Sequence, residues 1–190
     1  MVAPGTSERR LVARVRHWDG LAALIAAFIG VLALVVSGYT AYLQRQQVRA
    51  QVWPYLVSAN YDPEFAIKVL NKGVGPAIVH SVRVSVDDKP KHDWGQVLST
   101  LDVEVAKLRT STISDNVLRA NEMLAMIVFP DGASYRDFRA AARDRIALEI
   151  CYCSTLGECW VYSDGTPGAR AMQTAVDQCP RIAATDAFAD

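Results

Sequence analysis

An uncharged apolar run from Leu21 to Leu43, LAALIAAFIGVLALVVSGYTAYL, constrains this chain more than any other feature. Its 23 residues would form a helix about 35 Å long, and the hydrocarbon core of a bilayer is about 30 Å thick. Tyr39 and Tyr42 lie near one end of the run, where amphipathic rings favour the membrane interface. The run therefore predicts a transmembrane helix that contacts the lipid bilayer through residues 21–43.

Two other interpretations of this run are a cleaved signal peptide and a helix buried in a soluble core. The run exceeds the usual signal-peptide core of about 7–15 residues, and no A-x-A cleavage site directly follows it. A core helix of this length without a polar face would be unusual. An uncleaved membrane anchor is therefore favoured over both.

Basic residues on the two sides of the run predict its orientation. Four arginines precede the run and two follow it, and cytoplasmic flanks carry the excess of positive charge. We therefore expect a cytoplasmic N-terminus and a domain on the outer side of the membrane. The arginines are Arg9, Arg10, Arg14 and Arg16 before the run, and Arg45 and Arg49 after it.

The charge of the chain is unevenly distributed, although its formal total is zero. Residues 1–52 contain six Lys/Arg and two Asp/Glu, a net charge of +4 that suits anionic headgroups. Residues 53–190 contain 14 Lys/Arg and 18 Asp/Glu, a net charge of −4. Because this part has no basic stripe, we expect no nucleic-acid partner.

Beyond the polar stretch QRQQVRAQV and Trp53-Pro54, the hydrophobic pattern changes to a period of two, which is typical of strands. Five to seven short strands with mostly hairpin-length links favour a β-sandwich. The expected fold is mainly β with minor α: a transmembrane helix followed by an antiparallel, immunoglobulin-like β-sandwich with one or two short helical insertions. The expected strands cover residues 64–70, 77–88, 122–129, 145–153 and 159–163, with weaker candidates at 52–59 and 110–118.

Local patterns predict two helical insertions and the burial of one histidine. Apolar residues recur at helical spacing over 94–101, which predicts the first insertion. Ser134, with Asp137 three residues later, predicts a capping box for the second. His80 is in phase with the apolar face of its strand. We therefore expect it to lie in the core with its ring nitrogens hydrogen-bonded.

Three of the four cysteines lie in the segment CYCSTLGECW. In a strand, Cys151 and Cys153 would share one face with Glu149. STLGE has the length of a hairpin loop and would place Cys159 opposite Cys153, close enough for a disulfide. Four cysteines allow three pairings, and we expect Cys153–Cys159 and Cys151–Cys179. The second bridge would hold an otherwise loose C-terminal segment.

A redox centre and a zinc site are the alternatives to structural disulfides. Redox thiols usually lie in C-x-x-C at a helix N-terminus, whereas this C-x-C lies in a predicted strand beside Glu149, which would raise a thiol pKa. Zinc sites typically use C-x-x-C pairs, and a zinc site here would require a cytoplasmic domain. The alternative functions are therefore a periplasmic thiol–disulfide enzyme and a cytoplasm-facing domain with a zinc-binding cysteine cluster.

Other motifs do not indicate an active site. The sequence contains no H-E-x-x-H pair, nucleophile elbow or Walker loop, so we expect no enzyme, no cofactor and no metal. NKGVGPA is expected to be a tight turn between two strands. Turns expose side chains for recognition. The candidate binding residues in the two turns are Lys72, Gly73, Val74 and Gly75, and Thr155, Leu156, Gly157 and Glu158.

Small residues recur every four positions within the apolar run. Ala22, Ala26 and Gly30 form one row, and Ala33 and Ser37 form another. Such rows let two helices approach closely, although an alanine-rich composition also produces them by chance. A homodimer through Ala22, Ala26 and Gly30 is therefore an expectation of the sequence.

The apolar span, the VWPYL junction, the LNKGVGPA turn and the CYCSTLGECW segment together resemble a group of uncharacterised bacterial single-pass membrane-anchored proteins. The resemblance covers most of the chain beyond residue 20 and brings no activity or catalytic residue with it. It implies a location in the bacterial inner membrane.

The combined expectation is a signal-anchored inner-membrane protein that presents a disulfide-stabilised domain to the periplasm. This domain would act as a binding or structural module for an unknown envelope protein. The expected boundaries are a cytoplasmic tail over 1–20, the transmembrane helix over 21–43, a helical stalk over 44–52, the periplasmic domain over 53–180 and a flexible tail over 181–190.

Overall fold

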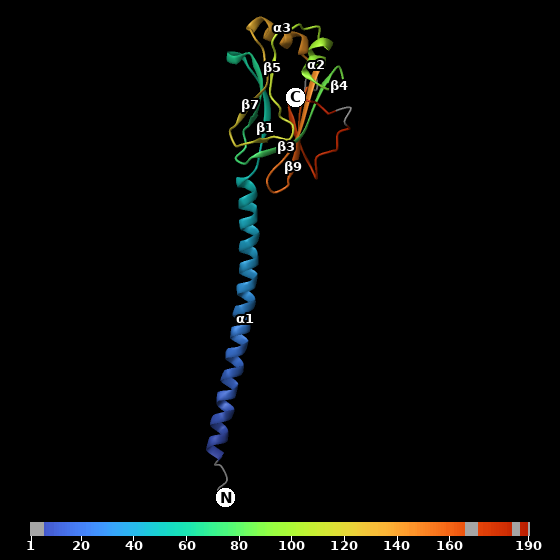
Figure 1. Cartoon of the computed structure of the whole chain (residues 1–190). Coiled ribbons are helices and arrows are strands. Elements are labelled where there is room, and N and C mark those ends of the chain that lie inside the picture. The colour runs from blue at the N-terminus through green and yellow to red at the C-terminus, as the bar shows by residue number, and fades with distance from the viewer. Residues whose placement is uncertain (1–5, 166–170, 184–186, 190) are drawn as a thin grey trace. The chain divides into compact units, whose positions relative to one another are not determined.

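The computed structural model describes residues 6–165, 171–183 and 187–189, and the chain divides into units 1–48 and 49–190 (Figure 1). We refer to the second unit as the C-terminal domain. Helix α1 (Thr6–Gln51) runs without a break through the regions predicted as a tail and as a stalk. It ends just before Trp53-Pro54, because a residue that precedes proline avoids the helical conformation.

One stretch of α1, Trp18–Gln51, is the only part of the described residues long and apolar enough to cross a membrane. It reaches a mean hydropathy of 2.6. Its large apolar side chains are exposed, with Phe28 at 71% and Leu34 at 75%. Lipid solvates such a surface, whereas exposing it to water is unfavourable. Helix α1 could therefore span a membrane, as the sequence predicts.

The C-terminal domain is a sandwich of two antiparallel sheets (Figure 1). Sheet A has the strand order β1-β2-β7-β5, and sheet B has the order β10-β9-β8-β3-β4, with β6 paired to β3. The strands of sheet A are β1 (Leu56–Tyr61), β2 (Ala66–Asn71), β7 (Met123–Val128) and β5 (Arg109–Thr110). The strands of sheet B are β10 (Met172–Val176), β9 (Cys159–Asp164), β8 (Ile146–Cys153), β3 (Ala77–Val86), β4 (Lys89–Lys91) and β6 (Val117–Leu118).

This strand order is that of an immunoglobulin fold. In that fold, strands A, B, E and D form one sheet and strands C, F and G form the other. Here β1, β2, β7 and β5 take the places of A, B, E and D, while β3, β8 and β9 take those of C, F and G. Strand β4 extends sheet B beside β3, and β10 extends it beside β9. The predicted antiparallel, immunoglobulin-like sandwich is confirmed.

Two short helices cover the edge of the core between the sheets, as predicted for the helical insertions. Helix α2 (Trp94–Thr100) buries Trp94, Val97 and Leu98. Helix α3 (Gly132–Ala142) buries Tyr135 and Phe138, and a single 3-10 turn (Asp62–Glu64) joins β1 to β2. The inner faces of the strands supply the rest of the core, which includes Leu56, Val69, Val84, Ile127, Ile150 and Tyr152.

The N-cap of α3 is Asp131, so the predicted capping box of Ser134 and Asp137 is wrong. One carboxylate oxygen of Asp131 accepts hydrogen bonds from the backbone N–H groups of Ala133 and Ser134, both at 2.9 Å. These N–H groups lie in the first turn of the helix and have no partner within it. The helix therefore begins earlier than expected, where an aspartate can satisfy them.

His80 is exposed, which contradicts the core histidine predicted from its phase. The pairing of β3 with β8 shifts register between Val79 and Ser81, so His80 is the extra residue of a β-bulge. A bulge moves the inward positions by one residue. Val79 is buried before the bulge and Val82 after it, although the two do not share a phase.

The segment after β9 differs from the sequence prediction in two ways. It forms β10, and it places Phe188 in the core at 4% exposure, edge-on to Trp94 with ring centroids 5.1 Å apart. The backbone N–H of Phe188 donates to the Val82 carbonyl at 3.3 Å. The flexible tail predicted over 181–190 is therefore wrong at Phe188, because burying an aromatic ring offsets the cost of ordering it.

A polar seam joins strand β1 of sheet A to sheet B. The Tyr162 hydroxyl accepts a hydrogen bond from the Ser58 N–H at 3.1 Å. The Tyr152 hydroxyl accepts from the Leu56 N–H at 3.4 Å and donates to the Gln173 side-chain oxygen at 2.6 Å. Gln173 in turn donates to the Leu56 carbonyl at 2.6 Å. These bonds satisfy backbone groups on the outer edge of β1 and close the sandwich there.

Candidate functional site

The cysteine hairpin consists of β8, the loop 154–158 and β9. Cys153 lies directly opposite Cys159 in the strand register, with Cα atoms 4.0 Å apart, and the two form a disulfide. Cys151 forms a second disulfide with Cys179, with Cα atoms 5.7 Å apart. The structure thus has the pairing expected from the sequence, and the second bridge fastens the segment after β10 to sheet B.

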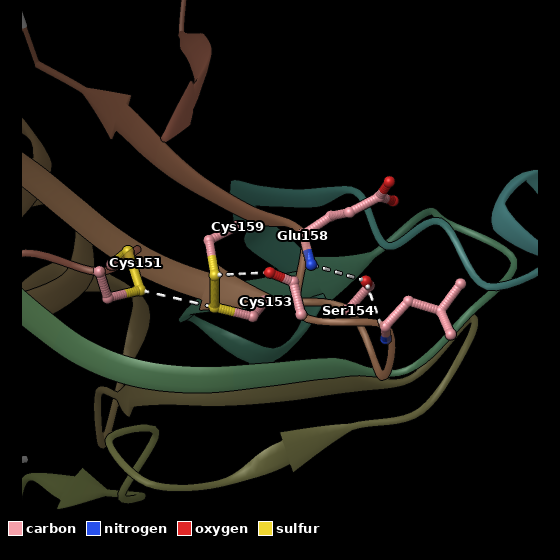
Figure 2. Close-up of a disulfide and its surroundings, with 8 residues drawn as sticks. Cys151, Cys153, Ser154, Glu158 and Cys159 are labelled. Carbon is pink, nitrogen blue, oxygen red and sulfur yellow. Dashed lines mark hydrogen bonds between the residues drawn. A yellow bond between two sulfur atoms is a disulfide. The ribbon is translucent and has the colours of Figure 1, made fainter. Parts of the chain in front are cut away.

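Ser154 organises the loop of the hairpin and is 2% exposed. Its hydroxyl accepts hydrogen bonds from the N–H groups of Leu156 and Glu158, at 3.2 and 3.3 Å. Figure 2 shows Ser154 facing Glu158 across the loop. Its own N–H donates to the Glu158 carbonyl at 2.7 Å. Gly157 has φ +77°, a conformation that favours glycine. The loop therefore sets the geometry that places Cys159 across from Cys153.

The two disulfides touch each other. The sulfur of Cys153 lies 3.9 Å from that of Cys179, and the three sulfurs of Cys153, Cys159 and Cys179 lie within 4.8 Å of one another. A disulfide sulfur carries no hydrogen, so the approach is a non-bonded contact. The same three sulfurs could bind a metal ion only as thiolates, after both bridges had been reduced.

Glu149 lies on the outer face of β8 with the cysteines, as expected. It forms an ion pair with Arg83 at 3.2 Å, directly across the β3–β8 pairing. Both side chains are partly exposed, at 42% and 37%. This contact accounts for Glu149 as half of a cross-strand pair on the sheet surface.

The candidate binding loop Lys72–Gly75 is only partly exposed. Lys72 and Val74 point outward, whereas Gly73 and Gly75 are buried, which corrects the expectation that the whole turn is available for binding. A Cβ atom on Gly75 would overlap the backbone of Val52, and one on Gly73 would overlap the Trp53 carbonyl. Both glycines are required for close backbone approach.

Asn71, which the sequence analysis did not single out, holds this turn together. It is fully buried, and its side-chain oxygen accepts hydrogen bonds from the N–H groups of Tyr55 (3.1 Å) and Gly73 (2.9 Å). Its amide nitrogen donates to the carbonyls of Gly75 (2.8 Å) and Leu118 (3.1 Å). The only sequence signal is its place before Lys-Gly, where asparagine often stabilises a turn.

The second candidate loop lies at the same end of the domain, because Ile78 near the start of β3 pairs with Cys153 at the end of β8. Thr155, Leu156 and Gly157 are exposed, and Glu158 is half-buried in an ion pair with Arg49 at 3.1 Å. We refer to this end of the C-terminal domain, residues 52–55, 71–76 and 153–159, as the closed end.

Chemically, the cysteine hairpin joins segments of the chain through disulfides. All four cysteines are in disulfides; Cys151, Cys153 and Cys159 are buried, and Cys179 is half-buried. Redox catalysis requires an accessible thiolate. Comparison with known proteins found no matching family model, no similar curated protein and no similar solved structure.

Proposed function

We propose that this protein is a single-pass anchor of the bacterial inner membrane that presents the C-terminal domain to the periplasm. The two disulfides carry the proposal, because such bonds persist in oxidising compartments and are rare in the cytoplasm. The excess of arginines before the apolar run favours the same orientation. The domain is a binding or structural module without catalytic activity, and its partner is an envelope protein.

The partner contacts the exposed residues of the closed end. Val74 is 63% exposed and Leu156 is 48% exposed, so each turn offers an apolar side chain to a partner. Lys72 and Thr155 lie beside them and are exposed as well. A pull-down with the full chain tests this surface. If the double variant Val74→Asp and Leu156→Asp still captures the same envelope protein as the unchanged chain, the closed end is not the binding surface.

Self-association through the membrane is a further part of this proposal. Ala22, Ala26 and Gly30 are exposed along one row of α1, and Gly30 has no atom within 4 Å of its Cβ position. Small residues at this spacing allow two helices to pack closely. Gly30→Leu should therefore reduce dimerisation of the full chain in a bilayer, and Leu32→Ala is the matched control outside the row.

A thiol count in intact cells tests the proposed location. Cells are denatured rapidly in acid and treated with a heavy maleimide, with and without prior reduction, and the gel shift is measured. We expect no label before reduction and four labels after it. Four labels before reduction would overturn the proposal and favour a cytoplasmic domain, in which the converging thiolates could hold zinc.

A second candidate function is thiol–disulfide exchange, which the 3.9 Å contact between Cys153 and Cys179 favours. An external dithiol would reduce the Cys153–Cys159 bond and become a disulfide. The Cys153 thiolate would then attack the Cys179 sulfur, form a Cys153–Cys179 bond and release Cys151 as a thiolate. Limited reduction with dithiothreitol, followed by peptide mapping, should yield a Cys153–Cys179 peptide only if this function is correct.

A further inference from the structure

Residues of both sheets and of α3 line a cavity of about 610 Å³. Helix α3 lies at one end of the domain (Figure 1). Sites for small molecules typically have volumes of about 300–1,000 Å³. Ile67 and Met126 of sheet A and Val84 and Leu148 of sheet B line its interior. The cavity therefore penetrates the apolar layer between the sheets. We refer to this part of the domain, residues 58–62, 129–146 and 164, as the open end.

The wall that β1 contributes becomes polar toward the open end. Leu56, Ser58 and Asn60 share one face of the strand, and Leu56 is buried in the core. Ser58 and Asn60 line the cavity. Tyr162, which bonds to the Ser58 N–H, marks the point where the polar seam stops and the cavity begins. A ligand would therefore meet an apolar interior and a polar mouth.

Trp94 of α2 contributes to the wall of the cavity. It is 6% exposed and lines the cavity, and its indole Nε1 has no hydrogen-bond partner among the described residues. A buried indole N–H usually has a partner. Because Nε1 itself has almost no accessible surface, Trp94 contributes its ring to the cavity wall and no donor to a ligand.

Three arginines of α3 and the turn after it surround the mouth of the cavity. They are exposed, and together with Asp144 and Asp164 they give the lining a net charge of +1. Arg139 forms an ion pair with Asp62 at 2.9 Å. Arg136 and Arg143 form no ion pair within 4.0 Å in the described part of the chain. Guanidinium groups bind carboxylates well, through two parallel hydrogen bonds.

We propose that this cavity binds a single-chain amphiphile with a carboxylate head, of the medium-chain fatty acid class. The chain occupies the space between the sheets, and the carboxylate lies at the mouth near Arg136 and Arg143. A single chain fits the cavity volume, and the arginines favour an anionic head over a neutral or cationic one. The site lies at the opposite end of the domain from the loops of the proposed function and does not depend on that function.

Photolabelling of the full chain in phosphatidylcholine nanodiscs tests the proposal. The probe is dodecanoate with a terminal diazirine, and the labelled peptides are mapped by mass spectrometry. We expect saturable labelling of β7 or β8, which unlabelled dodecanoate displaces at least about tenfold better than dodecanol or dodecyltrimethylammonium does. Labelling of α1 reports partition into the lipid and should not saturate.

Charge variants distinguish recognition of the carboxylate head from non-specific binding of any apolar chain. Arg136→Gln combined with Arg143→Gln should weaken displacement by dodecanoate about fivefold, while displacement by dodecanol stays unchanged. Arg119→Gln, an exposed arginine outside the cavity, is the matched control. Equal displacement by all three amphiphiles, or labelling confined to α1, would overturn the proposal. Neither result would change the thiol count that tests the membrane topology.

Discussion

At the closed end of the C-terminal domain, Asn71 and the Cys153–Cys159 disulfide fix the backbone of two turns and leave little free space. At the open end, residues of both sheets line a cavity, and the surrounding arginines are exposed. The same two sheets connect these ends. The comparison shows that hydrogen bonds and a disulfide hold the closed end, whereas the open end keeps a space between the sheets, where we propose that a ligand binds.

The largest effect is expected for Asn71→Ala at the closed end. The change leaves the Tyr55 and Gly73 N–H groups and the Gly75 and Leu118 carbonyls without their partner. Orphaned buried groups cost about 1–3 kcal/mol each, so we expect a loss of about 4 kcal/mol in the free energy of unfolding, measured by urea denaturation.

The matched control is Asn116→Ala, an exposed asparagine whose side chain donates to the Thr112 carbonyl at 3.3 Å and accepts from the Val117 N–H at 2.8 Å. It should cost about 0.5 kcal/mol or less. Equal losses for the two variants would show that the turn at Asn71 is not the stabilising feature that the comparison requires.

The next effect is expected for the two disulfides, and it should differ between them. Cys151 and Cys179 are separated by 28 positions in the sequence, and Cys153 and Cys159 by 6. Constraining the longer loop should contribute about 3–4 kcal/mol to stability, against about 2 kcal/mol for the shorter one. Denaturation of the two double Cys→Ala variants measures this. The reverse order would mean that the Cys153–Cys159 bridge also stabilises the folded state directly, in addition to constraining the unfolded chain.

A smaller loss is expected for Tyr162→Phe, which removes the end of the polar seam nearest the cavity. The Ser58 N–H loses its acceptor at 3.1 Å, and the cost should be about 1–2 kcal/mol. Hydrogen exchange should show faster opening at Ser58 with little change at Asn71. An equal change at both amides would indicate that the two ends open together.

Alkaline pH should weaken the seam further. Burial raises the pKa of Tyr152 to about 12, and it raises the pKa of Tyr162 as well. In the unfolded chain these tyrosines lose their protons near pH 10. Their contribution to the free energy of unfolding is therefore fully present below pH 10 and declines as the pH rises towards 12. Denaturation midpoints between pH 9 and pH 12 should follow this decline, and Tyr152→Phe should reduce its slope.

The smallest effect is expected for Arg139→Gln at the open end. Its ion pair with Asp62 is exposed, and exposed pairs contribute about 0–1 kcal/mol. The change in unfolding free energy should be close to the error of the measurement and should vanish in high salt. A loss as large as that of Asn71→Ala would remove the distinction between the two ends.

Much of this architecture was predictable from the sequence, because the strands alternate clearly and the turns carry strong signals. The five residues between Cys153 and Cys159 are long enough for a hairpin loop, so their pairing followed from spacing. The inward phase of β3 was predictable only on each side of His80, because the bulge is set by the partner strand β8.

The remaining features depend on contacts between distant parts of the chain. Phe188 lies in a segment without an apolar period, so its place beside Trp94 has no periodic signal. Gly73 and Gly75 read as parts of an exposed turn, but the backbone of residues 52–55 packs against them. The cavity is lined by residues of both sheets and of α3, and no local pattern encodes how these elements come together.

The polar seam has a consequence for the order in which this domain is made. The Tyr162–Ser58 and Gln173–Leu56 bonds join residues 104 and 117 positions apart, so the first strand lacks its lateral partners until β9 and β10 exist. Non-local pairing of this kind slows folding and exposes unfinished strand edges. During synthesis or export across a membrane, the outer edge of β1 would stay without hydrogen-bond partners until β9 and β10 had emerged. The domain could therefore reach its native state only after residue 173 had emerged.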